Sequence, residues 1–240
     1  MLWFEAHFSE IDLDKLLNAI FRLPDAIRPI YFSDNDSKRN KKNLVTNTKL
    51  FDAFIEKNRI GFFLRGEKGL YDIHTYPGLS PHINFDAPNE FQQYIMPLFE
   101  AVAPFDPCFA YAADREERIH RNRCFKTIGI NHIESWVGRD FKGFLPGLYC
   151  HTLISDRLVE KFNVDLAELV SAAPSHIEIG DQGQLHLFKF YDDTTTWRSH
   201  TDWLDELCSQ TRGVFSKRRV LEATAGVEDF EEYLDIMDQW

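Results

Sequence analysis

The order of predicted elements is the same in the two halves of this chain: a strand, an amphipathic helix, then a hairpin that turns through Gly-x-x-Gly. A period of two in apolar residues marks the strands and a period near 3.6 marks the helices. The segments are 2–8, 9–23 and 60–76 in the first half, and 148–154, 157–171 and 176–192 in the second. Hairpins and short connections favour an α+β fold, a mainly antiparallel sheet with helices packed on one face.

We therefore expect a single domain over residues 1–240. Whether 1–125 and 138–240 are a pseudo-repeat stays open, because the residues of the two halves align poorly.

Three residues give local predictions for the first half. Ser9 is the predicted N-cap of the first helix. Pro29 predicts an edge position for the strand at 26–32, and Pro97 should kink the helix that starts at Asn89.

The segment from Arg115 to Val137 has no clear overall pattern, and its structure is left unassigned. Its first part, "DREERIHRNR" from Asp114, alternates in charge and predicts a solvated helix with i, i+4 ion pairs. The expected pairs are Asp114–Arg118 and Glu117–Arg121. A helix at 47–58 and strands at 82–88 and 108–114 complete the predictions for the first half.

Cys150 and His151 are adjacent, a combination that could supply a nucleophile and its base. They lie in the strand predicted for 148–154, where successive side chains point to opposite faces, so we expect no dyad between them. The chain has four cysteines, too far apart for a CxxC motif. We expect them to be small buried hydrophobic residues without disulfides.

Charge and hydropathy exclude two classes of partner. With 38 acidic and 27 basic residues, the net charge is −11, which disfavours binding to nucleic acid. The sequence has no run of eighteen apolar residues, so we expect no membrane span. An N-terminus without a basic region or a cleavage site indicates the cytoplasm.

No catalytic residue, metal ligand or cofactor motif can be assigned. The nine histidines form no HxxxH or HExxH pair, and His176 and His186, like most of the others in strands, are expected to be packed rather than metal-bound. One alternative is a metal-dependent hydrolase or nuclease built from dispersed Asp, Glu and His residues. Pro24-Asp25 with Asp36-Ser37-Lys38 fits its loose two-acid-and-lysine spacing.

The C-terminal segment accumulates acidic residues, with no Lys or Arg after Arg219. It predicts an amphipathic helix whose wet face is either an ordinary surface or a docking site for a basic partner. On the second interpretation, exposed Tyr233 or Trp240 would be aromatic anchors. The candidate binding residues are Glu228, Asp229, Glu231, Glu232, Tyr233, Asp235, Asp238 and Trp240.

The segments "WVGRDFKGFLPGLYCHTLIS", "LVEKFNVDLAELVSAAP" and "HIEIGDQGQLHLFKFYDD" resemble the bacterial immunity protein 52 family over Trp136 to Asp193. The resemblance rests chiefly on the run from Pro146 to Tyr149. It implies a non-enzymatic protein that neutralises a toxin delivered between competing bacteria by a type VI secretion system. Its toxins include DNases resembling the restriction-endonuclease fold.

The resemblance implies an immunity protein, and the acidic charge is compatible with one that blocks the basic groove of a cognate nuclease toxin. We expect no direct contact to nucleic acid or membrane. The hydrolase is the first alternative, and an adaptor domain without a toxin partner is the second. An enzyme would gather titratable groups in one pocket, whereas an inhibitor would expose an acidic patch. The oligomeric state cannot be inferred from the sequence.

Overall fold

The computed structural model describes residues 1–36, 42–76, 80–180 and 183–240. In this part of the chain, nine strands form one sheet in the order β10-β11-β9-β6-β1-β5-β4-β3-β2, with helices beside it, and the predicted α+β class is confirmed. The chain divides into two compact units, Met1–Ala112 with Leu153–Ser155 and Glu178–Leu187, and Ala113–Thr152 with Asp156–Ile177 and Phe188–Trp240. The single domain and the pseudo-repeat stay predictions.

Up to Asp114 the strands are β1 (Leu2–His7), β2 (Tyr31–Ser33), β3 (Gly61–Arg65), β4 (Leu70–His74), β5 (His82–Ala87) and β6 (Phe109–Asp114). The helices are α1 (Leu13–Ile20), α2 (Thr48–Lys57) and α3 (Ile95–Val102), with 3₁₀ turns at Asn89–Tyr94 and Ala103–Phe105. The pairs β1–β5, β5–β4, β4–β3 and β3–β2 are all antiparallel. β2 lies at an edge of the sheet, as Pro29 predicted, but it begins at Tyr31. The first part of the strand expected at 26–32 is a turn instead, in which the amides of Ile27 and Arg28 bond to the Pro24 carbonyl.

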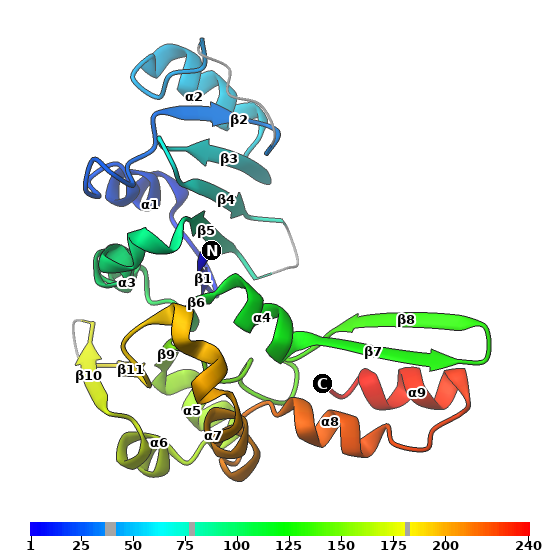
Figure 1. Cartoon of the computed structure of the whole chain (residues 1–240). Helices are drawn as coiled ribbons and strands as arrows, with labels where there is room; N and C mark the ends of the chain where they lie inside the picture. The colour runs from blue at the N-terminus through cyan, green and yellow to red at the C-terminus, as the bar shows by residue number, and fades with distance from the viewer. Residues whose placement is uncertain (37–41, 77–79, 181–182) are drawn as a thin grey trace. The chain divides into compact units, whose positions relative to one another are not determined.

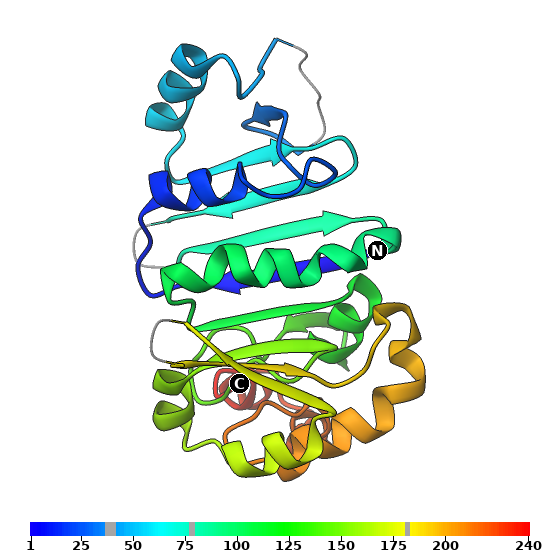
Figure 2. The same ribbon diagram turned by 90° about the vertical axis from the view of Figure 1, so that its left-hand side faces the viewer.

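Helices α1 and α3 cover one face of these strands, as expected (Figure 2). The alternation in β1 turns Leu2, Phe4 and Ala6 toward the helices, and the ring of Phe4 meets Phe99 of α3 edge-on at 5.1 Å. Burial of this kind contributes about 1.5–3 kcal/mol per large apolar side chain. The alternation of apolar residues at 2–8 therefore correctly marks a strand with one face buried in the core.

Two helix starts differ from the predictions. α1 is capped by Asp12, whose side chain accepts a hydrogen bond from the Lys15 amide at 3.2 Å, instead of by Ser9. The predicted helix from Asn89 is a 3₁₀ turn followed by α3, so Pro97 lies in the first turn of an α-helix. A proline is tolerated there, because the amide that it lacks would have no partner in the helix.

From Arg115 onward the chain adds α4 (Arg115–Asn122), β7 (Arg123–Ile128), β8 (Asn131–Trp136), β9 (His151–Ser155), α5 (Asp156–Phe162), α6 (Leu166–Ala172), β10 (Ser175–Ile179), β11 (Leu185–Lys189), a 3₁₀ turn (Thr194–Thr196), α7 (Trp197–Gln210), α8 (Lys217–Ala223) and α9 (Phe230–Met237). Figure 1 labels these helices and strands and shows the hairpin β7–β8 with α8 and α9 beside it. No described helix is long and apolar enough to traverse a bilayer.

Two predicted elements of this region are shorter than expected. The strand begins at His151 instead of Leu148, because the Tyr149 amide and carbonyl both bond to the hydroxyl of Thr152 and close a local turn. The helix predicted for 157–171 is two helices, α5 and α6. Asn163 between them has a left-handed φ of 52°, and Asp165 caps α6. The predicted Gly180–Gly183 turn includes residues 181 and 182, which lie outside the described residues.

Candidate functional site

The acidic residues predicted to bind a partner lie on and around α9, the amphipathic helix expected in the C-terminal segment. Asp229 is its N-cap and accepts a hydrogen bond from the Glu232 amide at 2.9 Å. All six acidic candidates are exposed: Glu228, Asp229, Glu231, Glu232, Asp235 and Asp238. The acidic face expected of this segment is therefore present.

Four of these side chains make no hydrogen bond or ion pair within the described part of the chain: Glu228, Glu231, Glu232 and Asp235. Asp238 pairs with Lys142 at 3.3 Å. Acids in the first turn stabilise a helix through its dipole, which accounts for Glu231 and Glu232. Asp235 lies toward the opposite end, where the dipole disfavours a negative charge, so helix stability does not explain it.

The aromatic candidates of this segment face inward. Tyr233 is only 2% exposed and belongs to a core with Cys124, Val220 and Met237, so its interpretation as an exposed anchor is wrong. Trp240 is half-buried and stacks on Phe144 at 4.7 Å, which leaves little of its ring available. The apolar residue that α9 does expose is Leu234, at 39%. One helical turn on either side of it lie Glu231 and Asp238.

The hairpin β7–β8, which was left unassigned from the sequence, packs against the same core as α9. Its inner side buries Cys124 and Ile128 in the same core as Tyr233 and Met237. Its outer side exposes aromatic rings, with Phe125 at 60% and Trp136 at 38%. The guanidinium groups of Arg118 and Arg139 lie 5.3 and 5.7 Å from the centre of the Trp136 ring, and that of Arg123 lies 4.2 Å from Phe125. In the sequence of 123–128, apolar Cys124 and Phe125 are adjacent and two polar residues follow them, so no period of two marks this strand.

A buried ion-pair network starts on α4, which is a helix as predicted but not a solvated one. Arg121 donates to Glu117 at 2.9 Å, as the i, i+4 spacing predicted, and also to Asp205 of α7. Glu117 is 0% and Arg121 5% exposed, and burial raises the pKa of Glu117. The cavity beside Arg121 and Asp205 measures about 10 Å³, room for one water molecule at most. Because no substrate could enter, we interpret this network as structural.

Cys150 and His151 are both buried, and their environments oppose the chemistry of a dyad. Burial raises the pKa of the Cys150 thiol well above its ordinary value and lowers the pKa of His151 to about 4. An activated pair needs the reverse, a thiolate beside a protonated imidazole. Cys150 instead donates to the carbonyl of Tyr191 at 3.2 Å. All four cysteines are unbridged and buried, as predicted.

The face of β1 and β5 that points away from α1 and α3 carries a polar cluster. Glu5, fully buried, accepts hydrogen bonds from Trp3, His7 and the Tyr111 hydroxyl at 2.9, 2.9 and 2.6 Å. The ring of His82 lies 5.4 Å from that of His7, and burial lowers the pKa of His82. Since the carboxylate is saturated by neighbouring donors, the arrangement is that of a structural polar network.

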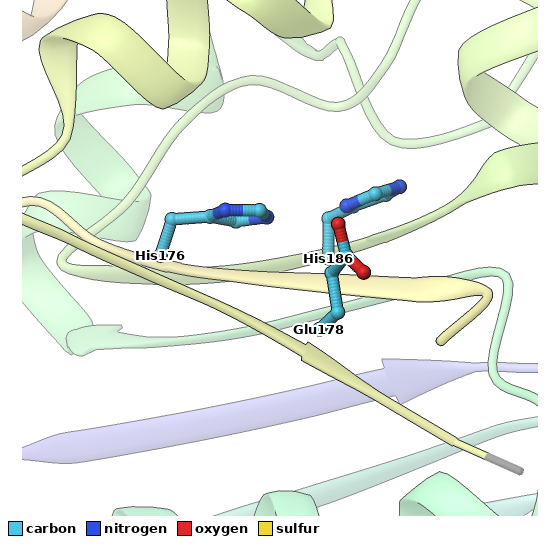
Figure 3. Close-up of side chains that lie close together, drawn as sticks. All are labelled: His176, Glu178 and His186. Atoms are coloured by element: carbon cyan, nitrogen blue, oxygen red, sulfur yellow. The ribbon is translucent and has the colours of Figure 1, made fainter. Parts of the chain in front are cut away.

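Three further polar side chains meet on the β10–β11 hairpin. One ligand atom from each of His176, Glu178 and His186 can be chosen so that all lie within 4.8 Å of one another. Figure 3 shows the imidazoles of His176 and His186 on one side of the hairpin, with the Glu178 carboxylate beside His186. A metal site in a protein is commonly built from at least three His, Cys, Asp or Glu side chains that are close enough together to hold the ion. Among the described residues, His176, Glu178 and His186 form such a group.

The structure describes the two acids of the nuclease alternative but not its lysine. Asp25 pairs with Arg28 at 2.9 Å in a turn, and the backbone carbonyl of Asp36 accepts a hydrogen bond from Arg65. Ser37 and Lys38 lie outside the described residues. The two acids and the lysine therefore stay a sequence hypothesis.

No family model and no curated protein matches this chain. A similar solved structure is the Pseudomonas aeruginosa type VI secretion system (T6SS) protein PA0821. The two share 12% identity over 78% of this chain, with a TM-score of 0.48. This chain spans 64% of the length of that protein. At this identity and TM-score the likeness carries no conclusion about function.

Proposed function

We propose that this protein is a non-enzymatic immunity protein, which binds a cognate antibacterial toxin and blocks its active groove. The partner is a basic protein, such as a nuclease effector of a type VI secretion system with a DNA-binding groove. The resemblance of Trp136–Asp193 to the immunity protein 52 family motivates the class of function. The surface of the C-terminal helix supports the mode of binding.

The observation that carries the proposal is the set of four exposed carboxylates, Glu228, Glu231, Glu232 and Asp235, without a partner inside the described chain. A charge that is already paired within the protein attracts a charged partner less strongly, because its neighbour partly cancels its potential. Unpaired charges on one helix present a negative potential to solvent, which accelerates encounter with a basic surface and selects its orientation. Exposed Leu234 lies among them and supplies apolar contact area.

The position of these side chains also suits a rigid contact. Tyr233 and Met237 anchor α9 to the core that it shares with the inner side of β7–β8. Such anchoring holds the carboxylates in place before binding, so that less conformational entropy is lost when a partner docks. This arrangement favours an inhibitor whose binding helix is preformed over a tail that folds on binding.

The test is inhibition of, and binding to, the toxin encoded by the neighbouring gene. Replacing Glu228→Gln, Glu231→Gln, Glu232→Gln and Asp235→Asn removes four negative charges from this surface. We expect the association rate to fall about tenfold at low salt, and protection of a toxin-expressing bacterial host to weaken. Circular dichroism of the variant should show that the fold is retained.

The matched control removes the same charges from exposed side chains elsewhere that also lack a partner, by Glu10→Gln, Glu100→Gln, Glu160→Gln and Asp34→Asn. It should bind and protect as the wild type does. If the two variants behave alike, net charge alone steers binding and α9 is not the contact. If the wild type neither binds nor protects, the proposed function is wrong.

A further inference from the structure

We propose that His176, Glu178 and His186 bind a divalent transition-metal ion. The chemistry of these three ligands favours Zn²⁺. The inference is independent of the proposed toxin binding. It also revises the sequence prediction that His176 and His186 are packed rather than metal-bound. The three residues belong to one hairpin, so their spacing is set locally by strand geometry.

The hairpin explains why the three side chains meet. His176 and Glu178 are two residues apart on β10, and residues at that spacing point to the same face. His186 and Phe188 have the same relation on β11. The His176 ring stacks on Phe188 with centroids 4.7 Å apart. The β10 face that carries His176 and Glu178 and the β11 face that carries His186 and Phe188 therefore lie on the same side of the hairpin. His186 and Glu178 then lie next to this stack (Figure 3).

The distances suit a metal after a small adjustment. The three ligand atoms lie within 4.8 Å of one another. Around a tetrahedral Zn²⁺, ligands at ~2.0–2.1 Å from the ion are ~3.4 Å apart. Glu178 is exposed, and its side chain can rotate to close the difference without moving the core. His186 is 6% exposed and provides a fixed ligand from which the site is built.

The donor set selects the kind of ion. Two imidazoles and one carboxylate are poor ligands for Mg²⁺ and Ca²⁺, which require oxygen donors, and lack the thiolates that Cu⁺ prefers. They suit divalent transition-metal ions. Fe²⁺ takes two His and one carboxylate but keeps further open positions, whereas Zn²⁺ commonly completes a tetrahedral shell with two His, one Glu and one water. A bound ion would link β10 to β11 across the hairpin and would be reachable from solvent on the side of Glu178.

The experiment is titration of untagged, chelator-treated protein with Zn²⁺ by isothermal titration calorimetry. We expect one ion per chain with a dissociation constant of ~10 µM or tighter. Substituting Co²⁺ should give the visible absorption bands of a tetrahedral site with nitrogen and oxygen ligands. Zn²⁺ should also raise the melting temperature, since an ion bound only by the folded state stabilises it.

The variants separate ligation from folding. Glu178→Gln and His176→Gln alter side chains that are not fully buried, so both should fold while each weakens Zn²⁺ binding by about tenfold or more. The control, His132→Gln with Glu160→Gln, removes the same two residue types from exposed positions and should bind as the wild type does. The proposal is overturned if the wild type shows no saturable binding below ~100 µM, or if His176→Gln with Glu178→Gln binds unchanged.

Discussion

Cys150 and His151 show how burial decides what a chemically capable residue can do. The sequence places a thiol beside an imidazole, and the alternation of a strand predicted that they would not act together. The structure adds that burial raises the pKa of the thiol and lowers that of the imidazole. For Tyr233, by contrast, the prediction from the sequence was wrong. An aromatic residue expected on the surface is 2% exposed, because residue type alone does not say which side of an amphipathic helix is wet.

At this scale, the stability of the protein should depend on the protonation of His151. Its pKa is about 4 when folded, whereas an unfolded histidine titrates near 6.5. Between these values the unfolded state binds more protons, so stability is lost as the pH falls from 6.5 to 4, by up to about 3 kcal/mol. Urea unfolding at pH 7, 6 and 5 should show this loss.

His151→Gln removes the titrating group at similar size. The difference in unfolding free energy between the wild type and this variant should therefore shrink as the pH falls. His132→Gln, at an exposed position, should keep the wild-type pH dependence. A constant difference between the wild type and His151→Gln from pH 7 to pH 5 would show that His151 is not buried as a neutral ring.

At the scale of elements, local periodicity predicted most strands and helices near their observed bounds. The strand at 108–114 is β6 and the helix at 47–58 is α2. The hairpin β7–β8 was missed, because neither 123–128 nor 131–136 alternates between apolar and polar residues. The local signal that remains is Gly129, which takes a positive φ of 58° in the two-residue loop, where glycine is favoured.

The packing of α9 against this hairpin gives a test within one helix. Tyr233→Ala should lower the free energy of unfolding by about 3–4 kcal/mol, because it removes a buried aromatic ring and leaves a cavity. Leu234→Ala, one residue along and 39% exposed, should cost less than about 1 kcal/mol. Urea denaturation of both variants measures the contrast. Equal costs would mean that α9 does not pack through Tyr233.

For the whole molecule, the dominant property is a net charge of −11, concentrated after Arg219 in a stretch without Lys or Arg. The sum of these charges acts at a distance on any charged partner, and salt screens it. The sequence predicted this property fully, since charge is counted without a fold. The structure contributed the finding that four of the C-terminal carboxylates have no partner in the described chain.

Association with the toxin should therefore depend on salt through the rate of encounter. Raising NaCl from ~50 to ~500 mM shortens the Debye length from ~14 to ~4 Å. We expect the association rate constant to fall at least about tenfold, while the dissociation rate constant changes much less. Surface plasmon resonance at several salt concentrations measures both. An equal change in both constants would indicate that paired charges at the contact, rather than the long-range potential, control binding.

The sequence by itself determined the α+β class, the edge position of β2, the unbridged cysteines and the acidic helix at the C-terminus. These properties follow from local periodicity, from a single proline or from composition. Only the tertiary structure decided that Glu117 and Arg121 are buried and that Tyr233 faces inward. It also decided that His176 and His186 share one face of a hairpin with Glu178. Such facts depend on strand register and on contacts between residues distant in the chain, which no local pattern encodes.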